Sequence, residues 1–348
     1  MAVFDEVKPP FFIIGTERSG TNLLRLILNS HSNIAIPHPP HIMKNLFKLE
    51  PFYGDLSKDL NFMRLIRDVE TIIRLHPYPW GIKIDKNEIF RQVRERNLIN
   101  VFFAVYEQYL ESTLKKRWGC KSTFMIYHVE LIKRYYPSAK FIYMVRDGRD
   151  VAASARKTIF NRYNIYFIAN LWKKEQEIGI SWRNRLSKEE IFLVRYEDLL
   201  SKPAETVSSL CLFLDEPYQE DMLSFFDSAE AKKSGSLSEA WRNTSSPIIK
   251  DNYGKFNAQL SKNQVILFES IAGKELEHFS YALTKPVAFS TGKQLKRDRF
   301  KFTYLIEEIF LMVLVQLRHV FTDKNSFLRF KKFIFLQYLK ISLALKWR

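Results

Sequence analysis

An α/β fold, in which a P-loop-like parallel sheet is flanked by helices, is the class that this sequence predicts. Short apolar runs alternate with segments of helical spacing over residues 11–214. A glycine-rich loop follows the first apolar run. Hydrophobic residues make up 46% of the 348-residue chain, which is enough for a full core. We therefore expect a sheet covered by helices on both faces.

The predicted elements follow from their periodicity, taken in chain order. Apolar runs bounded by Gly, Pro or charged residues predict strands at 11–14, 34–36, 140–145 and 191–194. Apolar residues spaced three or four apart predict helices at 19–29, 59–75, 86–116, 123–135, 147–157 and 203–214. Ligands bind at the carboxyl ends of parallel strands, so we expect the site in the loops after residues 14 and 145.

The loop after the first strand has the sequence Gly15-Thr16-Glu17-Arg18-Ser19-Gly20-Thr21-Asn22. Backbone N–H groups in such a loop and at the following helix start favour an anion. A nucleotide-triphosphate P-loop has Lys and then Ser or Thr after its second glycine, for the phosphates and for magnesium. Here Thr21 and Asn22 take those places, and the cation of the loop is Arg18. This pattern disfavours a magnesium-dependent kinase or NTPase.

Charge and cysteine content narrow the function further. The net charge is +16, and residues 293–348 hold thirteen Lys and Arg against four Asp and Glu. The main domain therefore need not bind nucleic acid. Cys120 and Cys211 form no disulfide framework, and no Cys/His set has zinc-ligand spacing, so we expect no metal. The N-terminal residues do not resemble a secretory signal, and we expect a cytoplasmic protein.

The C-terminal residues predict a separate basic helical extension. Residues 284–294 have the composition of a linker, which divides the chain into an α/β domain at 1–285 and an extension at 286–348. Residues 327–347 form an apolar helical stripe flanked by Lys and Arg, and such a helix fits an anionic membrane surface. A helical pair packed on the main domain or on a second subunit fits the pattern equally well.

A second motif follows the strand at 140–145. Arg146 comes directly after the strand, and Ser154 lies eight residues further, within the next predicted helix. An Arg fork and a Ser hydroxyl at these positions suit a phosphate. A salt-bridged Arg-Asp-Gly-Arg turn is the structural alternative. With the first loop, this motif predicts two separate anion pockets, one at each strand end.

Together, the two motifs resemble those of the sulfotransferases that use 3′-phosphoadenosine-5′-phosphosulfate (PAPS), in the branch with Arg-Ser-Gly-Thr in the first loop. The resemblance covers residues 11–283 and implies PAPS as donor and no metal. It implies that Arg18, Ser19, Gly20, Thr21 and Asn22 hold the 5′-phosphosulfate, whereas Arg146 and Ser154 hold the 3′-phosphate. By the same resemblance, Lys121 reaches the transferring group, Tyr196 lies near the adenine and Lys255 contacts phosphates.

The catalytic base departs from the pattern of the family. Many relatives carry a glutamate after the second strand, but this chain has Pro37-His38-Pro39-Pro40-His41 there. A histidine can accept a proton from an alcohol near neutral pH. His41 and His38 are the candidates, and we favour His41 because we expect it to begin a helix that faces the cleft. Glu50 and residues 76–88 stay open as alternatives.

Three function classes compete on this sequence. The first is a PAPS-dependent sulfotransferase acting on an acceptor hydroxyl of a glycan, lipid, small molecule or peptide tyrosine, with a glycan or glycolipid favoured. The second is a P-loop nucleotide kinase or NTPase. The third is a non-enzymatic protein that binds a membrane or nucleic acid through the basic C-terminal segment. No specific nucleic-acid partner is expected for the first class.

Overall fold

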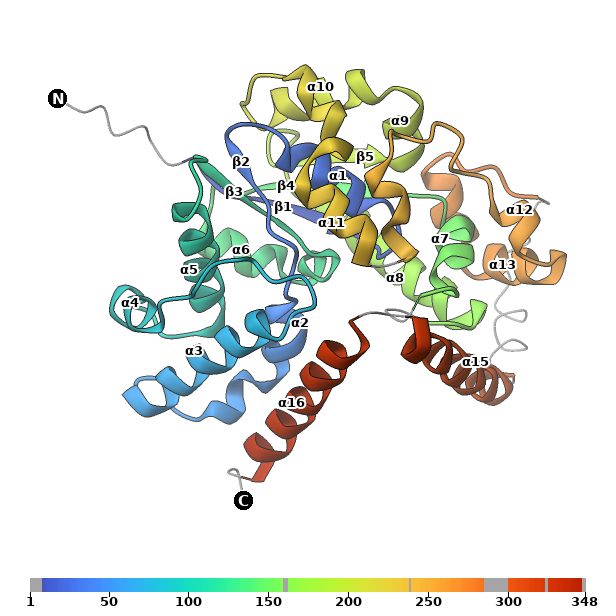
Figure 1. The fold of residues 1–348 in the computed structure, drawn as a ribbon. Coiled ribbons are helices and arrows are strands. Elements are labelled where there is room, and N and C mark those ends of the chain that lie inside the picture. Colours follow the sequence, from blue (N-terminus) through green and yellow to red (C-terminus); the bar gives the residue numbers. More distant parts are fainter. Residues whose placement is uncertain (1–7, 159–161, 238, 285–299, 323–324, 346–348) are drawn as a thin grey trace.

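The computed structural model describes residues 8–158, 162–237, 239–284, 300–322 and 325–345. Within them, five parallel strands form one sheet in the order β2-β3-β1-β4-β5. Figure 1 shows the sheet crossing the molecule, with helices on both sides. The predicted P-loop-like α/β class is thus confirmed. The strands are β1 Phe11–Gly15, β2 Ile34–Ala35, β3 Arg117–Lys121, β4 Lys140–Val145 and β5 Ile191–Arg195.

The helices alternate with these strands along the chain. The α-helices are α1 Thr21–Asn29, α2 Ile42–Leu46, α3 Asp59–Arg74, α4 Lys86–Gln92, α5 Leu98–Glu111, α6 Val129–Tyr135, α7 Gly148–Ala155, α8 Ile165–Arg185, α9 Tyr196–Ser201, α10 Pro203–Phe213, α11 Ala229–Leu237, α12 Phe256–Gln259, α13 Lys262–His278, α15 Lys301–Thr322 and α16 Ser326–Leu345. The 3₁₀ segments are η1 Phe47–Tyr53, η2 Thr123–His128, η3 Glu220–Asp227 and η4 Glu239–Ser245.

One predicted helix, over residues 86–116, is wrong in its extent. The structure has two helices there, α4 and α5, and then the unpredicted strand β3. Strand β3 begins with Arg117, whose side chain is fully buried and donates to the carbonyl oxygens of Pro9 and Leu214. A strand that starts and ends on a cation does not show the apolar run that strand prediction requires.

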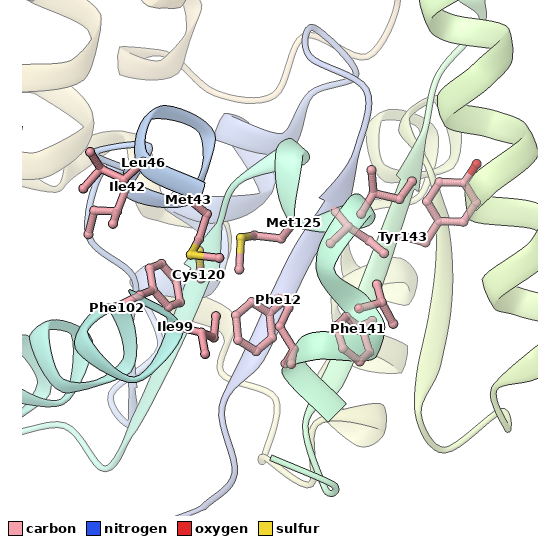
Figure 2. Packing of buried hydrophobic residues seen from close by; sticks show 14 of the residues in the cluster. Phe12, Ile42, Met43, Leu46, Ile99, Phe102, Cys120, Met125, Phe141 and Tyr143 are labelled. Carbon is pink, nitrogen blue, oxygen red and sulfur yellow. The ribbon is translucent and has the colours of Figure 1, made fainter. Parts of the chain in front are cut away.

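The two faces of the sheet bury different sides of each strand. Phe12 and Ile14 of β1 face the core formed with α2, α3, α5 and α8, whereas Phe11 and Ile13 face α1, α9 and α10. Figure 2 shows the first core, where Phe12 lies among side chains of β3, β4, α2 and α5. Helices thus cover both faces, as a parallel sheet requires.

The end of β1 lies unusually close to its neighbour β4. Gly15 pairs with Met144, and a Cβ at residue 15 would lie 2.2 Å from the carbonyl oxygen of Met144. Only glycine tolerates this approach, together with the φ of +140° that it adopts. The chain therefore leaves β1 tightly against β4, and the loops that follow both strands lie side by side.

The C-terminal helices α15 and α16 pack on the main domain at the edge shown in red in Figure 1. Glu308 of α15 accepts hydrogen bonds from the backbone N–H groups of Tyr163 and Asn164. Leu339 and Leu343 of α16 are buried in the main core. The predicted boundary at 285–286 lies outside the described residues. In the described part of the chain, no helix has the length and apolarity needed to cross a bilayer.

Candidate functional site

A cavity of about 690 Å³ lies at the carboxyl ends of β1, β3 and β4. This volume falls in the range of small-molecule sites. Residues of both sequence motifs line this one cavity, so the two separate anion pockets that the motifs predict are a single space. Eleven of the predicted site residues line it: Arg18, Gly20, Thr21, Asn22, His38, His41, Lys121, Arg146, Ser154, Tyr196 and Lys255. The twelfth, Ser19, is buried beneath the loop.

The loop after β1 is shaped by two residues in the left-handed region. Arg18 has φ +74° and Gly20 has φ +89°, and the N–H of Ser19 donates to the carbonyl of Thr16. Non-glycine residues seldom adopt such a φ, and strain of this kind gathers at functional sites. The turn directs the start of α1 at the cavity, where Thr21 and Asn22 lie.

The predicted partners Arg18, Arg146 and Ser154 meet at the centre of the cavity. The Nε of Arg18 donates to Ser154 Oγ at 3.1 Å, which joins the first loop to α7. The guanidinium of Arg146 donates to the backbone oxygens of Arg18 at 3.3 Å and of Asn252 at 3.2 Å. Ser154 therefore lies beside Arg18 as well as near Arg146, and both predicted phosphate groups share this region.

One buried carboxylate holds the rim of the cavity in place. Asp150 accepts hydrogen bonds from the N–H of Gly254 at 2.7 Å and of Phe256 at 2.9 Å, and contacts Arg146 at 3.4 Å. The segment it holds carries Lys255, an exposed side chain at the cavity edge. Asp150 thus positions both the guanidinium of Arg146 and the segment that carries Lys255.

The two arginines of the Arg-Asp-Gly-Arg turn differ: one is held in salt bridges and the other faces the cavity. Arg149 is locked between Asp147 at 2.7 Å and Glu269 at 2.6 Å, away from the cavity. Arg146, in contrast, lines the cavity. The salt-bridged turn and the ligand-facing arginine, which the sequence left as alternatives, are therefore both present in the same motif.

Tyr196 forms the floor beneath Arg146. The guanidinium carbon of Arg146 lies 4.4 Å from the ring centroid, a cation–π contact, and Asn252 donates to the phenolic oxygen at 2.7 Å. A Cβ on Gly20 would lie 2.2 Å from the same ring. The buried position of Tyr196 beside the loop fits both a role in the hydrophobic core and contact with the adenine of a bound nucleotide.

Lys121 ends β3 and projects into the cavity between the loop and the histidines. Burial, followed by the charge of Arg25, lowers the pKa of Lys121 to about 7. Burial and the nearby Arg146 lower the pKa of Arg18 to about 10. The cavity is lined by more cations, among them Arg18, Lys121 and Arg146, than carboxylates, which are Glu17 and Asp150. A multivalent anion would complement this positive potential.

Several buried polar atoms around the loop lack a hydrogen-bond partner among the described residues. They are Ser19 Oγ, Asn22 Nδ2 and Arg146 Nε. An unsatisfied buried donor costs about 1–3 kcal/mol. Asn22 and Arg146 line the cavity, so the phosphate oxygens of a bound ligand would supply acceptors for these two side chains, whereas Ser19 does not line it.

The predicted bases His38 and His41 lie at another part of the cavity. His41 has φ +62° and directly precedes α2, as expected, and its buried Nδ1 has no hydrogen-bond partner among the described residues. Burial is the main reason that the pKa values of both histidines lie well below 6.5. Both rings are therefore neutral near pH 7. Glu50 accepts from the N–H of Leu98 and does not line the cavity.

Sequence reasoning missed three side chains at this end. His76 lines the cavity, with its ring 5.1 Å from that of His38 and 6.4 Å from that of His41. Residues 76–88 were left open only as a range. Arg329 and Lys332 of α16 also line the cavity. No motif signals them, because their position depends on how α16 packs.

A metal site was not expected. Over the described ranges, no group of three or more His, Cys, Asp or Glu side chains is arranged to hold a metal ion.

The chain matches the profile of the Sulfotransferase family over residues 9–220, which is more than half of its length. The fold and the cavity at the ends of β1 and β4 define an α/β protein of the P-loop-like class. This protein belongs to the sulfotransferase family.

The chain is also similar to individual sulfotransferases. It is 20% identical over 225 residues to a protein-tyrosine sulfotransferase of Drosophila melanogaster, covering 63% of this chain and 40% of that protein. It is 23% identical over 260 residues to human protein-tyrosine sulfotransferase 1, covering 73% and 64%. The chain thus spans less than two thirds of each relative.

Among solved structures, the chain resembles the sulfotransferase domain of the Synechococcus PCC 7002 olefin synthase. The TM-score is 0.54 at 18% identity, over 80% of this chain and 98% of that domain. This likeness supports the fold and leaves the acceptor open.

Proposed function

We propose that this protein transfers a sulfuryl group from PAPS to an acceptor hydroxyl. The observation that carries the proposal is the gathering of Arg18, Lys121 and Arg146 around one cavity, with unsatisfied donors between them. Such a site suits a ligand with several phosphate or sulfate groups. Membership of the sulfotransferase family supports the same reaction class.

In this proposal the two motifs bind opposite ends of the donor, which supplies the sulfuryl group. Residues 18–22 and the start of α1 would hold the 5′-phosphosulfate, and Arg146, Ser154 and Lys255 the 3′-phosphate. The arrangement that supports this is the contact of Arg146 with Asn252, next to the segment that Asp150 holds and that carries Lys255, while Arg146 also donates to the Arg18 carbonyl of the loop. Tyr196 would lie against the adenosine.

Catalysis would rest on positioning and on charge stabilisation. Negative charge develops on the leaving phosphate oxygen during transfer, so cations placed there stabilise the transition state more than the ground state. Lys121 and Arg18 are the side chains available for that role. A Lys121 with a pKa near 7 would be fully protonated once the bound anion raises that pKa.

We infer that His41 takes the proton of the acceptor hydroxyl. Its ring lines the cavity, its Nδ1 lacks a partner among the described residues, and burial keeps it neutral. A neutral imidazole is the form that accepts a proton. His38 is the second candidate, and its ring stacks on Tyr78 at 4.2 Å.

The acceptor and the location are part of the proposal. We propose a glycan or glycolipid hydroxyl, reached at an anionic membrane face of the cytoplasm. The free, buried thiols of Cys120 and Cys211 are consistent with a reducing compartment. Exposed apolar side chains on α15 and α16, beside exposed lysines, support membrane contact.

Calorimetry with 3′-phosphoadenosine-5′-phosphate (PAP) and adenosine monophosphate tests the donor site. We expect PAP to bind at least about tenfold more tightly, since a charge-assisted contact to the 3′-phosphate contributes roughly 1.5–3 kcal/mol. Arg146→Ala should remove this preference. Equal affinity for both nucleotides in the wild type would refute the donor assignment.

Two further measurements separate the competing classes. Transfer of labelled phosphate from ATP with magnesium would favour a kinase instead. Strongly salt-dependent binding to nucleic acid that survives Arg146→Ala would favour a non-enzymatic binder.

Sedimentation with lipid vesicles tests the proposed membrane contact, and binding should require anionic lipid. Equal binding to phosphatidylcholine alone would contradict an electrostatic contact.

A further inference from the structure

The C-terminal helix α16 forms one wall of the cavity. Arg329, Lys332, Phe333 and Leu336 of this helix line the same space as Arg18 and Arg146. The family match ends at residue 220, so this wall lies outside the matched region. It is absent from the motifs that define the donor site.

The position of α16 is fixed by contacts with the main domain. Leu339 is 1% exposed and Leu343 is fully buried in the main core. Arg64 donates to Ser342 Oγ at 3.1 Å, and Lys332 Nζ donates to the carbonyl of Pro40 at 3.0 Å. Helix α16 is therefore held on the main domain both beside the cavity, at Lys332, and in its C-terminal half.

The wall lies at the histidine end of the cavity. Pro40, which binds Lys332, directly precedes His41. His41 and His76 lie within the electrostatic influence of both Lys332 and Lys121, and Lys121 is in turn close to Arg18. Lys121 therefore lies within electrostatic reach of both the histidine end and Arg18. An acceptor approaching the histidines would meet α16.

The α16 wall combines two cationic side chains with two apolar ones. Arg329 and Lys332 stand one turn apart, and desolvation followed by the charge of Arg329 lowers the pKa of Lys332 to about 7. The lining carboxylates are Glu17, which pairs with Lys44 at 2.9 Å, and Asp150, which is at the donor end. Phe333 and Leu336 add apolar surface to the same wall.

Further exposed apolar side chains lie along α16 and on α15. On α16 the exposed large apolar side chains are Phe327, Phe330, Phe333, Ile334, Tyr338, Ile341 and Leu345, and α15 adds Phe302, Ile306, Ile309, Phe310, Val313 and Leu317. Contiguous apolar surface rimmed by cations is typical of interfaces with acidic lipid. Lys301, Lys331 and Lys340 are exposed on these helices.

We propose that α16 builds an acceptor subsite for an anionic amphiphile, in which Arg329 and Lys332 bind the acidic group and Phe333 and Leu336 contact the start of the apolar chain. The proposal rests on the sulfotransferase function and specifies its acceptor class. The rest of the apolar chain would stay in the membrane against α15 and α16. The acceptor hydroxyl would then lie at His41.

Dodecyl phosphate is a suitable probe, because it has the acid and the chain but no hydroxyl to be sulfated. Its binding is measured by calorimetry on the full chain saturated with PAP, which blocks the donor site. Dodecyl maltoside, inorganic phosphate and an acidic tyrosine peptide serve as matched probes. We expect dodecyl phosphate to bind about tenfold or more tightly than each of them.

Arg329→Gln with Lys332→Gln should weaken dodecyl phosphate binding by about tenfold or more and leave PAP affinity within twofold. Lys331→Gln is the control, because Lys331 is exposed on the same helix and does not line the cavity. Lys332→Arg with intact Arg329 should keep binding. Thermal unfolding of each variant checks that α16 stays folded.

Three results would overturn the subsite: unchanged dodecyl phosphate binding in the double variant, equal binding of dodecyl maltoside or inorganic phosphate, or preferred binding of the tyrosine peptide. If PAP fails to bind, the sulfotransferase proposal fails by itself. In that case dodecyl phosphate binding is compared between the double variant and Lys331→Gln without PAP, and equal binding by the two variants would still overturn the subsite.

Discussion

The two walls of the cavity differ in what places their cations. On the sheet side, Lys121 ends β3, Arg146 comes directly after β4, and Arg18 lies three residues after the end of β1, so all three depend on the hydrogen-bonded sheet. On the other side, Arg329 and Lys332 belong to α16, which two buried leucines and a few polar contacts hold on the main domain. The donor wall is thus part of the fold, and the acceptor wall is attached to it.

Under the proposed function, this difference would let a sulfotransferase keep its donor site while its acceptor site changes. The sheet-side cations depend on strand ends that belong to the fold. Changing α16 alters the surface beyond residue 220 and leaves the donor wall intact. Four experiments test this division, in order of expected effect.

His41→Ala tests the junction between the walls and should have the largest effect. We expect kcat to fall by about 10²–10⁴-fold, since a general base contributes that much, while PAP affinity stays the same. Because burial lowers the pKa of His41, the wild-type rate should hold below pH 6.5 and decline only as His41 becomes protonated at lower pH. Steady-state rates from pH 4.5 to 8 give the profile. Full activity in His41→Ala, with loss in His38→Ala, would move the base to His38.

Arg18→Ala tests the sheet-side wall during the chemical step. Turnover should fall by about 10²–10³-fold, as for the loss of one transition-state donor, because Arg18 lines the cavity. The melting temperature should change little. Assays with labelled PAPS and circular dichroism on the same sample separate the two effects. Transfer at near-normal rates would show that the loop lies elsewhere in the reaction.

The pair Arg146→Ala and Arg149→Ala tests whether one motif divides ligand binding from structure. Arg146→Ala should weaken PAP binding by about 10- to 100-fold with little loss of stability. Arg149→Ala leaves Asp147 and Glu269 without their shared cation, and should lower the free energy of unfolding by about 3–5 kcal/mol. Calorimetry and urea unfolding measure the two. The reverse pattern would exchange their roles.

Lys121 provides the smallest and most specific test. Its pKa in the free protein is about 7, and a bound anion raises that pKa, so PAP binding at pH 8 should take up a proton. PAP affinity should therefore fall as pH rises above 7, by up to about tenfold per pH unit. Calorimetry in buffers of different ionisation enthalpy measures the uptake. Lys121→Arg should bind PAP without it, and no uptake in the wild type would contradict the burial of Lys121.

Local patterns were enough to predict that Arg18, Arg146 and Ser154 lie after strand ends at one edge of the sheet. The glycine-flanked loop and the Arg after an apolar strand carry their own backbone geometry, but the contact of Arg18 with Ser154 in a single cavity was not predicted. Strands β1, β4 and β5 were predicted within one residue at each end. These elements are apolar inside and punctuated by Gly or charge at their ends.

Tertiary packing decided the features that sequence did not predict. Strand β3 begins with a buried Arg117, whose charge is satisfied by distant carbonyls and Glu216. Helix α8, for which no element was predicted, places Gln176 against Thr16 beneath the loop at 2.8 Å. The α16 wall depends on Leu339 and Leu343 entering a core formed far earlier in the chain. No local pattern reports such long-range contacts.

The absence of a side chain at residue 20 ties the two motifs to each other. A single added methyl there would push into the ring of Tyr196, on whose face Arg146 rests. Gly20 of the loop thus packs against Tyr196, and Tyr196 packs against Arg146, so the protein itself makes these contacts. Residues 20, 196 and 146 should therefore vary together among relatives. A relative with a side chain at position 20 needs a smaller residue at position 196, and another group must then support the guanidinium at position 146.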